Sequence, residues 1–404
     1  MRTTRVELSS ATPGPPTLAG VALTLIHTGR APTRSALTRQ LGVTRATVGA
    51  VTGELRDLGL IEVDAGAGDG HQGRPSHRLL PHPSGPVALA AQVHPDGFAV
   101  ALVGLGGAVV AHQAVHGLVP ADPVRAFGPV AEAAAALLDA SGRRCVGVAA
   151  SLPTAVTRPG GTAVRALYVG WPDGTPVRDL LAAELARCGV RFGCDVVNDV
   201  NALALAEHRH GAGRDTTHLL VVSAERRGVG GALVQDGALY TGSGGLAMEA
   251  GHVSVDPEGR PCRCGNRGCL NVEADAERFL SLAGHRVAPD VTVLDQAVAV
   301  LRAGYPADPG VRAAADAIAA RLGLALAGLI NVLNPDRVLL GGMYQELLRV
   351  APDQLRAAVA GHSPWGRGAG VPVEGCALSD GGLIGAAEVA WQPVLDNPAL
   401  LQPT

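Results

Sequence analysis

The chain has 404 residues, of which 47% are hydrophobic, and its formal net charge is −3. This length and apolar content are sufficient for two or three domains with sizeable cores. Gly, Pro or a charged residue interrupts every apolar stretch before it reaches about 18 residues, and the first residues do not resemble a secretory leader. We therefore expect neither secretion nor a membrane-spanning segment.

The remaining composition bears on source and compartment. All 33 basic residues are arginine, which together with 54 Gly and 28 Pro indicates a GC-rich bacterial genome rather than a functional demand for guanidinium groups. The seven cysteines are an odd number and, outside one cluster, are scattered, so they do not predict a disulfide framework. We expect a cytoplasmic bacterial protein.

Charge is distributed unevenly along the chain. Residues 1–82 contain nine Arg and six acidic residues, whereas the remainder contains 24 Arg and 30 acidic residues. This asymmetry favours an N-terminus that faces nucleic acid on an acidic body. Residues 1–16 are rich in Ser, Thr and Pro without apolar periodicity, and we expect them to be disordered.

Residues 17–59 have the spacing of a helix-turn-helix. A first helix is predicted from Leu18 until Gly29 ends it, and a second covers 34–41 after Thr33 as its N-cap. The third begins after Thr44 as its cap and has an apolar face formed by Val48, Val51, Leu55 and Leu58. The tight turn between the last two helices at Gly42-Val43 completes the motif.

A wing is predicted after the third helix. Strands at 60–63 and 77–80 flank a glycine-rich loop, and together with the helices they form a winged helix-turn-helix over residues 17–82. In this arrangement the start of the third helix enters the major groove and the wing reaches the minor groove. The predicted DNA-contacting residues are Arg34, Thr44, Arg45, Thr47 and Arg74. The alternatives are a motif used only for protein contacts and a solvated charged face.

From about Pro86 onward the chain alternates strand-like and helical runs, which is typical of an α/β fold. A hairpin and a third strand at 87–115 precede a helix at 124–141, and a second unit of the same kind follows. A long apolar helix is predicted at about 311–333 and a last helix at 381–390. We expect two related α/β lobes that flank a cleft.

Three cysteines lie within the short run from Pro261 to Cys269. Cys262, Cys264 and Cys269 supply three thiol ligands, and His252 lies just upstream as the fourth ligand of a tetrahedral site. A closed Cys3His set predicts a structural zinc ion rather than a hydrolytic one. The alternative is an incidental cluster of buried thiols.

The motif Glu249-x-Gly251-His252 followed by Cys262-x-Cys264-Gly265-x-x-Gly268-Cys269 resembles the ROK family, which groups repressors, open reading frames and sugar kinases. The resemblance implies an actin-like, ribonuclease H-like ATPase fold across residues 86–404, with a zinc knuckle at 252–269. Gly73-Arg74-Pro75-Ser76 is similar to the wing of the family's transcriptional repressors.

Asn198-Asp199 follows a predicted strand and precedes a helix predicted at 200–210. From spacing alone, Asp199 is equally consistent with a base for a sugar hydroxyl and with the cap of that helix. The resemblance implies that Asn198 and Asp199 hold a sugar, and that Glu249 and His252 contact it.

Several positions differ from the pattern that the resemblance implies. Gln92-Val93-His94-Pro95-Asp96 stands where the kinases have an Asp-x-Gly phosphate loop, and Glu225 lies in the second phosphate segment. Asn271 replaces a sugar-binding Glu, Tyr168 replaces an Asn, and Glu273 is a candidate substitute for the missing carboxylate. Without the phosphate clamp, phosphoryl transfer is not expected, so Asp199 would be vestigial as a catalytic residue.

The sequence therefore predicts a ROK-family transcriptional regulator, most simply a repressor that binds double-stranded operator DNA. We expect a homodimer or homotetramer with a structural zinc ion and a cavity for a carbohydrate-like effector, lined by Asn198, Asp199, Glu249, His252, Asn271 and Tyr168. The alternatives are an ATP-dependent, glucokinase-like sugar kinase and an effector-independent regulator with a degenerate pocket.

Overall fold

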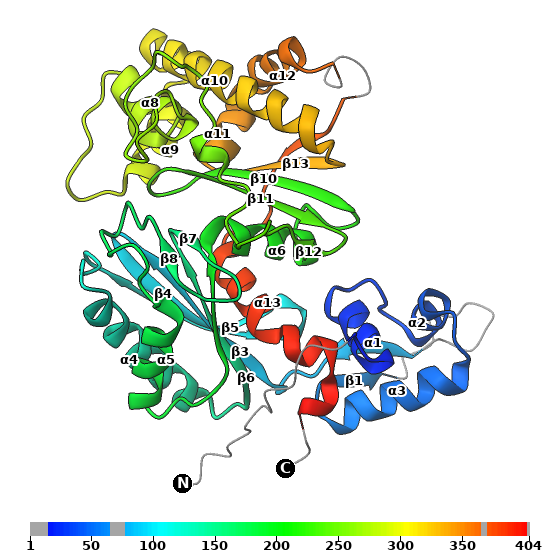
Figure 1. Cartoon of the computed structure of the whole chain (residues 1–404). Helices are drawn as coiled ribbons and strands as arrows, with labels where there is room; N and C mark the ends of the chain where they lie inside the picture. Colours follow the sequence, from blue (N-terminus) through cyan, green and yellow to red (C-terminus); the bar gives the residue numbers. More distant parts are fainter. Residues whose placement is uncertain (1–14, 65–76, 365–369, 402–404) are drawn as a thin grey trace.

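The structure, a computed structural model, describes residues 15–64, 77–364 and 370–401. Two lobes, each built on a five-stranded sheet, lie one above the other, and a small helical unit is attached beside the lower one (Figure 1). The predicted segment at 1–16 falls almost entirely outside the described residues, and so does Arg74 in the predicted wing.

The small unit, here the N-terminal unit, contains three helices and a two-stranded antiparallel sheet: α1 (Leu18–His27), α2 (Arg34–Leu41), α3 (Arg45–Asp57), β1 (Ile61–Asp64) and β2 (Arg78–Pro81). Thr17, Thr33 and Thr44 cap the three helices with side-chain oxygens that accept backbone N–H groups. Gly42 ends α2 in the left-handed conformation, with φ of 64°. The predicted helices are confirmed, and their boundaries were predictable because local capping residues set them.

The first lobe has the strand order β5-β4-β3-β6-β9, in which β5, β4 and β3 are antiparallel while β3, β6 and β9 are parallel. Its strands are Val87–His94 (β3), Gly97–Gly104 (β4), Val109–His116 (β5), Cys145–Leu152 (β6) and Cys194–Asn198 (β9), and its helices are Pro123–Ser141 (α4) and Val177–Arg187 (α5). Strand β6 is buried along its whole length, as expected for a central parallel strand covered on both faces.

The second lobe repeats this pattern with the order β12-β11-β10-β13-β14. Its strands are His218–Ala224 (β10), Val229–Gln235 (β11), Ala238–Leu239 (β12), Arg337–Gly342 (β13) and Val373–Gly375 (β14). Its helices are Leu270–Glu273 (α7), Ala276–Leu282 (α8), Val293–Gly304 (α9), Pro309–Leu333 (α10), Met343–Val350 (α11) and Pro352–His362 (α12). The matching strand orders confirm the prediction of two related α/β lobes.

Helix α10 is, among the described residues, the one long and apolar enough to cross a membrane by length and composition. It packs against α8 and α12, and 56% of its most apolar window is buried inside the protein. Its buried face includes Ile318, Leu322 and Leu326. The apolar composition of α10 is therefore explained by its place in the core of the second lobe.

Two helices lie at the junction of the lobes: α6 (Asp199–His210) packs against β10 and β11, and α13 (Gly381–Asp396) packs against β3 and β6. The predicted last helix is confirmed, although α13 continues past the predicted end at Ala390. The two helices approach so closely that a Cβ atom on Gly385 would lie 1.8 Å from the carbonyl oxygen of Ala202. Gly385 is therefore required for this contact.

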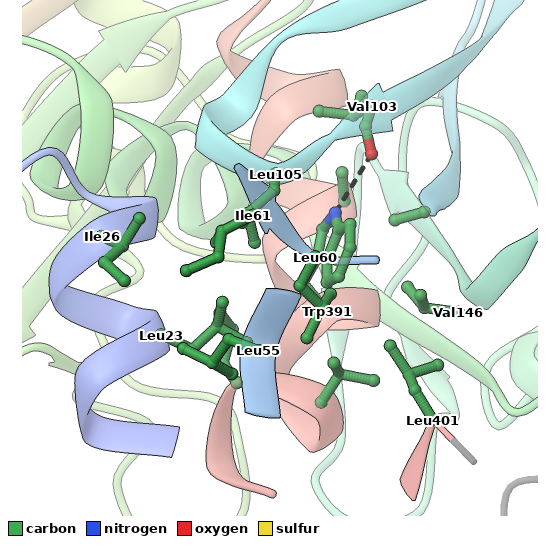
Figure 2. Packing of buried hydrophobic residues seen from close by; sticks show 14 of the residues in the cluster. Leu23, Ile26, Leu55, Leu60, Ile61, Val103, Leu105, Val146, Trp391 and Leu401 are labelled. Carbon is green, nitrogen blue, oxygen red and sulfur yellow. Dashed lines mark hydrogen bonds between the residues drawn. The ribbon is translucent and has the colours of Figure 1, made fainter. Parts of the chain in front are cut away.

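One hydrophobic core is shared between the N-terminal unit and the first lobe. Figure 2 shows Leu23, Leu55 and Ile61 of the N-terminal unit beside Trp391 of α13, whose indole N–H donates to the carbonyl of Val103 at 3.0 Å. All four of these packed side chains are fully buried. Burying a large apolar side chain stabilises a fold by about 1.5–3 kcal/mol. The shared core therefore attaches the N-terminal unit firmly to the first lobe.

Candidate functional site

The four predicted metal ligands come together. The ligand atoms of His252, Cys262, Cys264 and Cys269 all lie within 4.8 Å of one another. The Sγ atoms of Cys264 and Cys269 are 3.7 Å apart, close to the edge of about 3.8 Å expected for a tetrahedron of thiolates around zinc. The sulfur of Cys262 lies 3.8 Å from Nδ1 of His252, which identifies Nδ1 as the imidazole ligand atom. The residues fit a closed four-coordinate metal site.

Glycine makes the knuckle loop possible. Gly268 has φ of 60°, and a Cβ atom there would lie 1.5 Å from the carbonyl oxygen of Asp256. The backbone N–H of Cys262 donates to the carbonyl of Asn266 at 2.8 Å, which closes the turn between the first and last thiols. The turn between the thiols is therefore supported by a backbone hydrogen bond and by the absence of a side chain at Gly268.

Glu273 does not take the role suggested by its sequence position. Its carboxylate is buried, accepts the backbone N–H of Arg260 at 2.7 Å, and lies 3.6 Å from the guanidinium of Arg321 on α10. Glu273 lines none of the cavity described next. The hypothesis that it replaces the missing sugar-binding carboxylate is wrong, because two residues rotate Glu273 by about 200° around α7 from Asn271, toward the base of the knuckle loop.

All six predicted effector-contacting residues line one cavity of about 390 Å³ between the lobes. They come from the β9–α6 junction, the segment before α5, the loop that follows β12, and α7: Asn198, Asp199, Tyr168, Glu249, His252 and Asn271. Arg165, Leu246 and Met248 also line the cavity, although no local sequence pattern indicated them. His252 is thus shared between the cavity and the metal-ligand cluster.

The helix cap at the cavity differs from the expectation. Asn198, not Asp199, is the N-cap of α6, and its Oδ1 accepts the N–H groups of Val200 and Asn201 at 3.0 and 3.1 Å. Asp199 is the first residue of the helix, and its Oδ1 accepts an N–H bond from the Asn198 amide at 3.0 Å. Asn198 is therefore the N-cap, although Oδ1 of Asp199 also accepts the Val200 N–H at 2.8 Å, and Asp199 lines the cavity.

Asp199 lies where two cavities meet, and its carboxylate is surrounded by other acidic groups. Burial, followed by the charges of Glu225 and Glu249, raises the pKa of Asp199 to about 7. Burial also raises the pKa of Glu225, which is hydrogen-bonded by the hydroxyl of Ser223. A carboxylate with such a pKa near neutrality is suited to accept or share a proton with a hydroxyl ligand.

The two replaced sugar-pocket positions are bonded to each other. The Asn271 amide donates to the Tyr168 hydroxyl, and Oδ1 of Asn271 accepts the backbone N–H of Val229 at 2.6 Å. A Cβ atom on Gly228 would lie 2.6 Å from both side chains, so the pair packs directly on this backbone. The two side chains therefore hold each other in place, and the amide nitrogen and Oδ1 of Asn271 each make a hydrogen bond within the protein.

A second cavity of about 430 Å³ lies between the lobes on the other side of Asp199 and Glu225. Gln92 and Arg226 line it, and Arg226 donates to Asp96 at 2.8 Å across the cleft. This ion pair joins the β3–β4 turn of the first lobe to the β10–β11 turn of the second. The two segments that would hold phosphates in a kinase are therefore tied to each other.

The N-terminal unit presents part of the predicted DNA-contacting set. Thr44 and Arg45 are exposed at the start of α3, and Thr47 is half-buried with its hydroxyl 2.9 Å from that of Thr44. Arg34 is half-buried and donates to Thr52 at 3.0 Å, so its guanidinium ties α2 to α3. The geometry leaves Thr44 and Arg45 as the most accessible members of the set.

Comparison with known proteins identifies the family. The ROK family matches residues 96–392, which is most of the chain. The chain belongs to the ROK family. Among solved structures, a ROK family transcriptional regulator that is a homologue of the Escherichia coli MLC protein aligns over 95% of this chain and 96% of its own, with a TM-score of 0.74 and 23% identity.

Relatives of this ROK protein include both regulators and kinases. The chain is 33% identical to a glucokinase from Halalkalibacterium halodurans over 49% of its own length and 61% of that protein. It is 29% identical to the DNA-binding transcriptional dual regulator NagC of Escherichia coli over 52% of each chain. A ROK family glucokinase structure from Streptomyces griseus covers 76% of this chain with a TM-score of 0.63 and 22% identity.

Proposed function

We propose that this ROK-family chain is a transcriptional repressor. In this proposal residues 17–82 bind operator DNA, residues 86–404 form the regulatory ROK domain, and a homodimer or homotetramer sets the spacing between DNA-binding units. The supporting observation is the exposed start of α3, where Thr44 and Arg45 face solvent on a unit that shares its core with the first lobe. A helix N-terminus with exposed hydroxyl and guanidinium groups is suited to the major groove.

The knuckle would hold zinc through His252, Cys262, Cys264 and Cys269. A zinc ion bound there supplies structural cross-linking of the loop, because four protein ligands leave no open position for a substrate. The loop carries Glu249 and His252 to the wall of the cavity. Zinc would thereby fix the shape of the effector site.

The cavity would take a carbohydrate-like effector through hydrogen bonds to Asn198, Asp199 and Glu249. An effector that binds one arrangement of the lobes more tightly than another shifts the population toward that arrangement. In a dimer, half-sites lie about 34 Å apart, so a small rotation of the DNA-binding units changes the fit to the operator. The effector-independent regulator remains the alternative if no ligand stabilises the protein.

A sugar kinase is the second candidate, and it is favoured by the glucokinase relatives and by the pKa of about 7 at Asp199. Gln92 and the Asp96–Arg226 ion pair argue against it. Phosphoryl transfer requires a metal-binding carboxylate and a cationic clamp free to engage triphosphate. A coupled ADP-release assay with ATP and a hexose panel separates the two functions.

The test of DNA binding uses point variants of the full-length protein, because removing residues 1–82 would expose the shared core. A random-sequence double-stranded DNA pool is first enriched on the wild-type protein, and binding of the selected sequence is measured by fluorescence anisotropy at physiological salt with competitor DNA. We expect Arg45→Ala to weaken binding by roughly tenfold or more, as for the loss of one base or phosphate contact.

Arg56→Ala is the matched control, because Arg56 is exposed at the opposite end of the same helix, where it pairs with Asp57. It should bind the selected DNA as the wild type does. Failure to enrich any sequence, or equal affinities of the wild type and Arg45→Ala, would contradict the proposal.

A further inference from the structure

A fully buried carboxylate joins the N-terminal unit to the lobes. Glu388 of α13 has no exposed side-chain surface, and both of its oxygens lie 2.9 Å from Nε2 of His27 on α1. It also accepts hydrogen bonds from Arg209 at 2.6 Å and from His210 at 2.8 Å, both at the end of α6. Helices α1, α6 and α13 therefore meet at the Glu388 carboxylate. A buried charge of this kind is tolerated only while its hydrogen-bonding and charged partners are present.

These side chains form a charge-balanced junction. The backbone N–H of Gly106 donates to Nδ1 of His27 at 2.9 Å, so the neutral imidazole carries its proton on Nε2 and donates it to Glu388. A metal bound at Nε2 would instead place the proton on Nδ1, facing another N–H donor. His27, His210 and Glu388 are thus arranged to hold helices together rather than to bind a cation, although their ligand atoms lie close together.

Helices α6 and α13 each begin at one of the two cavities, and the C-terminal end of each contacts α1. Asn198 and Asp199 at the start of α6 line the cavity proposed for the effector, and the 12 residues of the helix extend about 18 Å to the junction. Helix α13 begins with Gly381 in the second cavity and ends at Asp396, whose carbonyl accepts the backbone N–H of Thr17 at 2.9 Å. Figure 1 shows α13 running from the lobes to α1.

Helices α6 and α13 pack in close backbone contact. A Cβ atom on Gly385 would lie 1.8 Å from the Ala202 carbonyl, and one on Gly381 would lie 2.4 Å from the Leu203 side chain. A second close contact joins α13 to the N-terminal unit, because a Cβ atom on Gly20 of α1 would lie 2.2 Å from the Asp396 carbonyl. Close backbone packing transmits displacement because interiors have few voids to absorb it.

We propose that α6 and α13 act as one lever that couples the effector cavity to the N-terminal unit through the Glu388 junction. This inference rests on the proposed function, and it specifies the physical route. A ligand that displaces Asn198 and Asp199 moves the start of α6, and His210 and Arg209 pass the movement to Glu388 and His27.

The test uses hydrogen–deuterium exchange of the full-length, zinc-loaded protein and needs neither an operator nor an identified ligand. Asn198→Ala removes the N-cap of α6, and the loss of one cap corresponds to about a fivefold change in a local opening equilibrium. We expect about fivefold faster exchange in α6 and also in α1, residues 18–27. Asn198→Ser, which keeps a capping oxygen, should restore exchange to near the wild-type rate.

Thr292→Ala is the matched control, because Thr292 caps α9, which also has 12 residues and lies in the second lobe. It should accelerate exchange in α9 and leave α1 unchanged. In a His210→Phe background, which keeps an aromatic ring against His27 but removes one of the two bonds from the end of α6 to Glu388, Asn198→Ala should accelerate exchange in α1 less than it does in the wild-type background, because Arg209 still bonds to Glu388. Unchanged α1 exchange in Asn198→Ala, or equal acceleration by Thr292→Ala, would overturn the lever. These exchange measurements do not involve DNA. The lever can therefore be contradicted without contradicting the proposed function, and the reverse also holds.

Discussion

At the scale of single residues, Asp199 is a buried carboxylate with a raised pKa in the cavity proposed for an effector. Its pKa is raised to about 7, above the ordinary value of 3.8, so the folded state holds a proton that the unfolded state has lost between these values. The charged carboxylate therefore destabilises the fold increasingly as pH rises from about 4 to 7. This cost is complete above pH 7 and absent below the unfolded pKa.

Asp199→Asn should remove that cost while keeping the acceptor that binds the Val200 N–H. We expect the variant to be more stable than the wild type by about 4 kcal/mol at pH 8, since each pKa unit corresponds to about 1.4 kcal/mol, and the difference to shrink as pH falls to 5. Urea denaturation at the two pH values measures it. Asp195→Asn on the preceding strand β9 is the control, because it breaks an ion pair with Arg158 and should give no gain. A difference independent of pH would contradict the assignment.

Sequence patterns located the candidate site residues but not the bonds between them. The four candidate metal ligands lie within 18 positions of one another in a glycine-containing loop. Their residue types and spacing were therefore sufficient to predict that their side chains come together. The Tyr168–Asn271 hydrogen bond joins residues 103 positions apart, and the His27–Glu388 contact joins residues 361 positions apart. Such pairs depend on how the lobes pack, and no local pattern encodes that packing.

At the scale of elements, we expect a bound metal to stabilise the knuckle loop, residues 252–269. Cys264→Ser should lose the bound zinc and lower the melting temperature by roughly 5–10 °C, because the closed loop loses one of four ligands. Mass spectrometry for metal content and a thermal melt measure the two effects. Cys188→Ser, outside the cluster and half-buried, should retain zinc and melt as the wild type does. Equal zinc content in both variants would exclude Cys264 as a ligand.

Element boundaries were predicted well where local chemistry sets them. The N-terminal helices begin after capping threonines, and Gly42 and Gly59 adopt positive φ where the helices α2 and α3 end. The last helix was predicted too short, because its final turns after Ala390 are stabilised by contacts with α1 rather than by their own sequence. Tertiary packing therefore decides the extent of α13.

At the scale of the whole molecule, the Asp96–Arg226 ion pair is a direct link between lobes at the second cavity. Each side chain is about a third exposed, at 34% and 30%, so the pair stabilises closure only modestly. Reversing the charge of Arg226 should destabilise closure of the lobes by more than loss of the pair alone, because Arg226→Glu places a carboxylate beside Asp96 and Glu225.

We expect Arg226→Glu to open the cleft and increase the radius of gyration measured by small-angle X-ray scattering, with a smaller increase at high salt. Arg227→Glu is the matched control, since Arg227 is the adjacent, exposed residue and lines the other cavity. The same radius of gyration for both variants and the wild type would show that the ion pair does not hold the lobes.

The shared core also has a consequence for how the protein is made. Leu23 and Leu55 near the beginning of the chain complete their burial against Trp391, which the ribosome adds more than 300 residues later. Domains generally fold as their residues emerge, at about 5–20 residues per second during synthesis. The N-terminal unit must therefore wait for the last helix, so a nascent chain that stalls before α13 would display an incompletely packed unit. Completion of translation would therefore be needed before the N-terminal unit reaches its final packing.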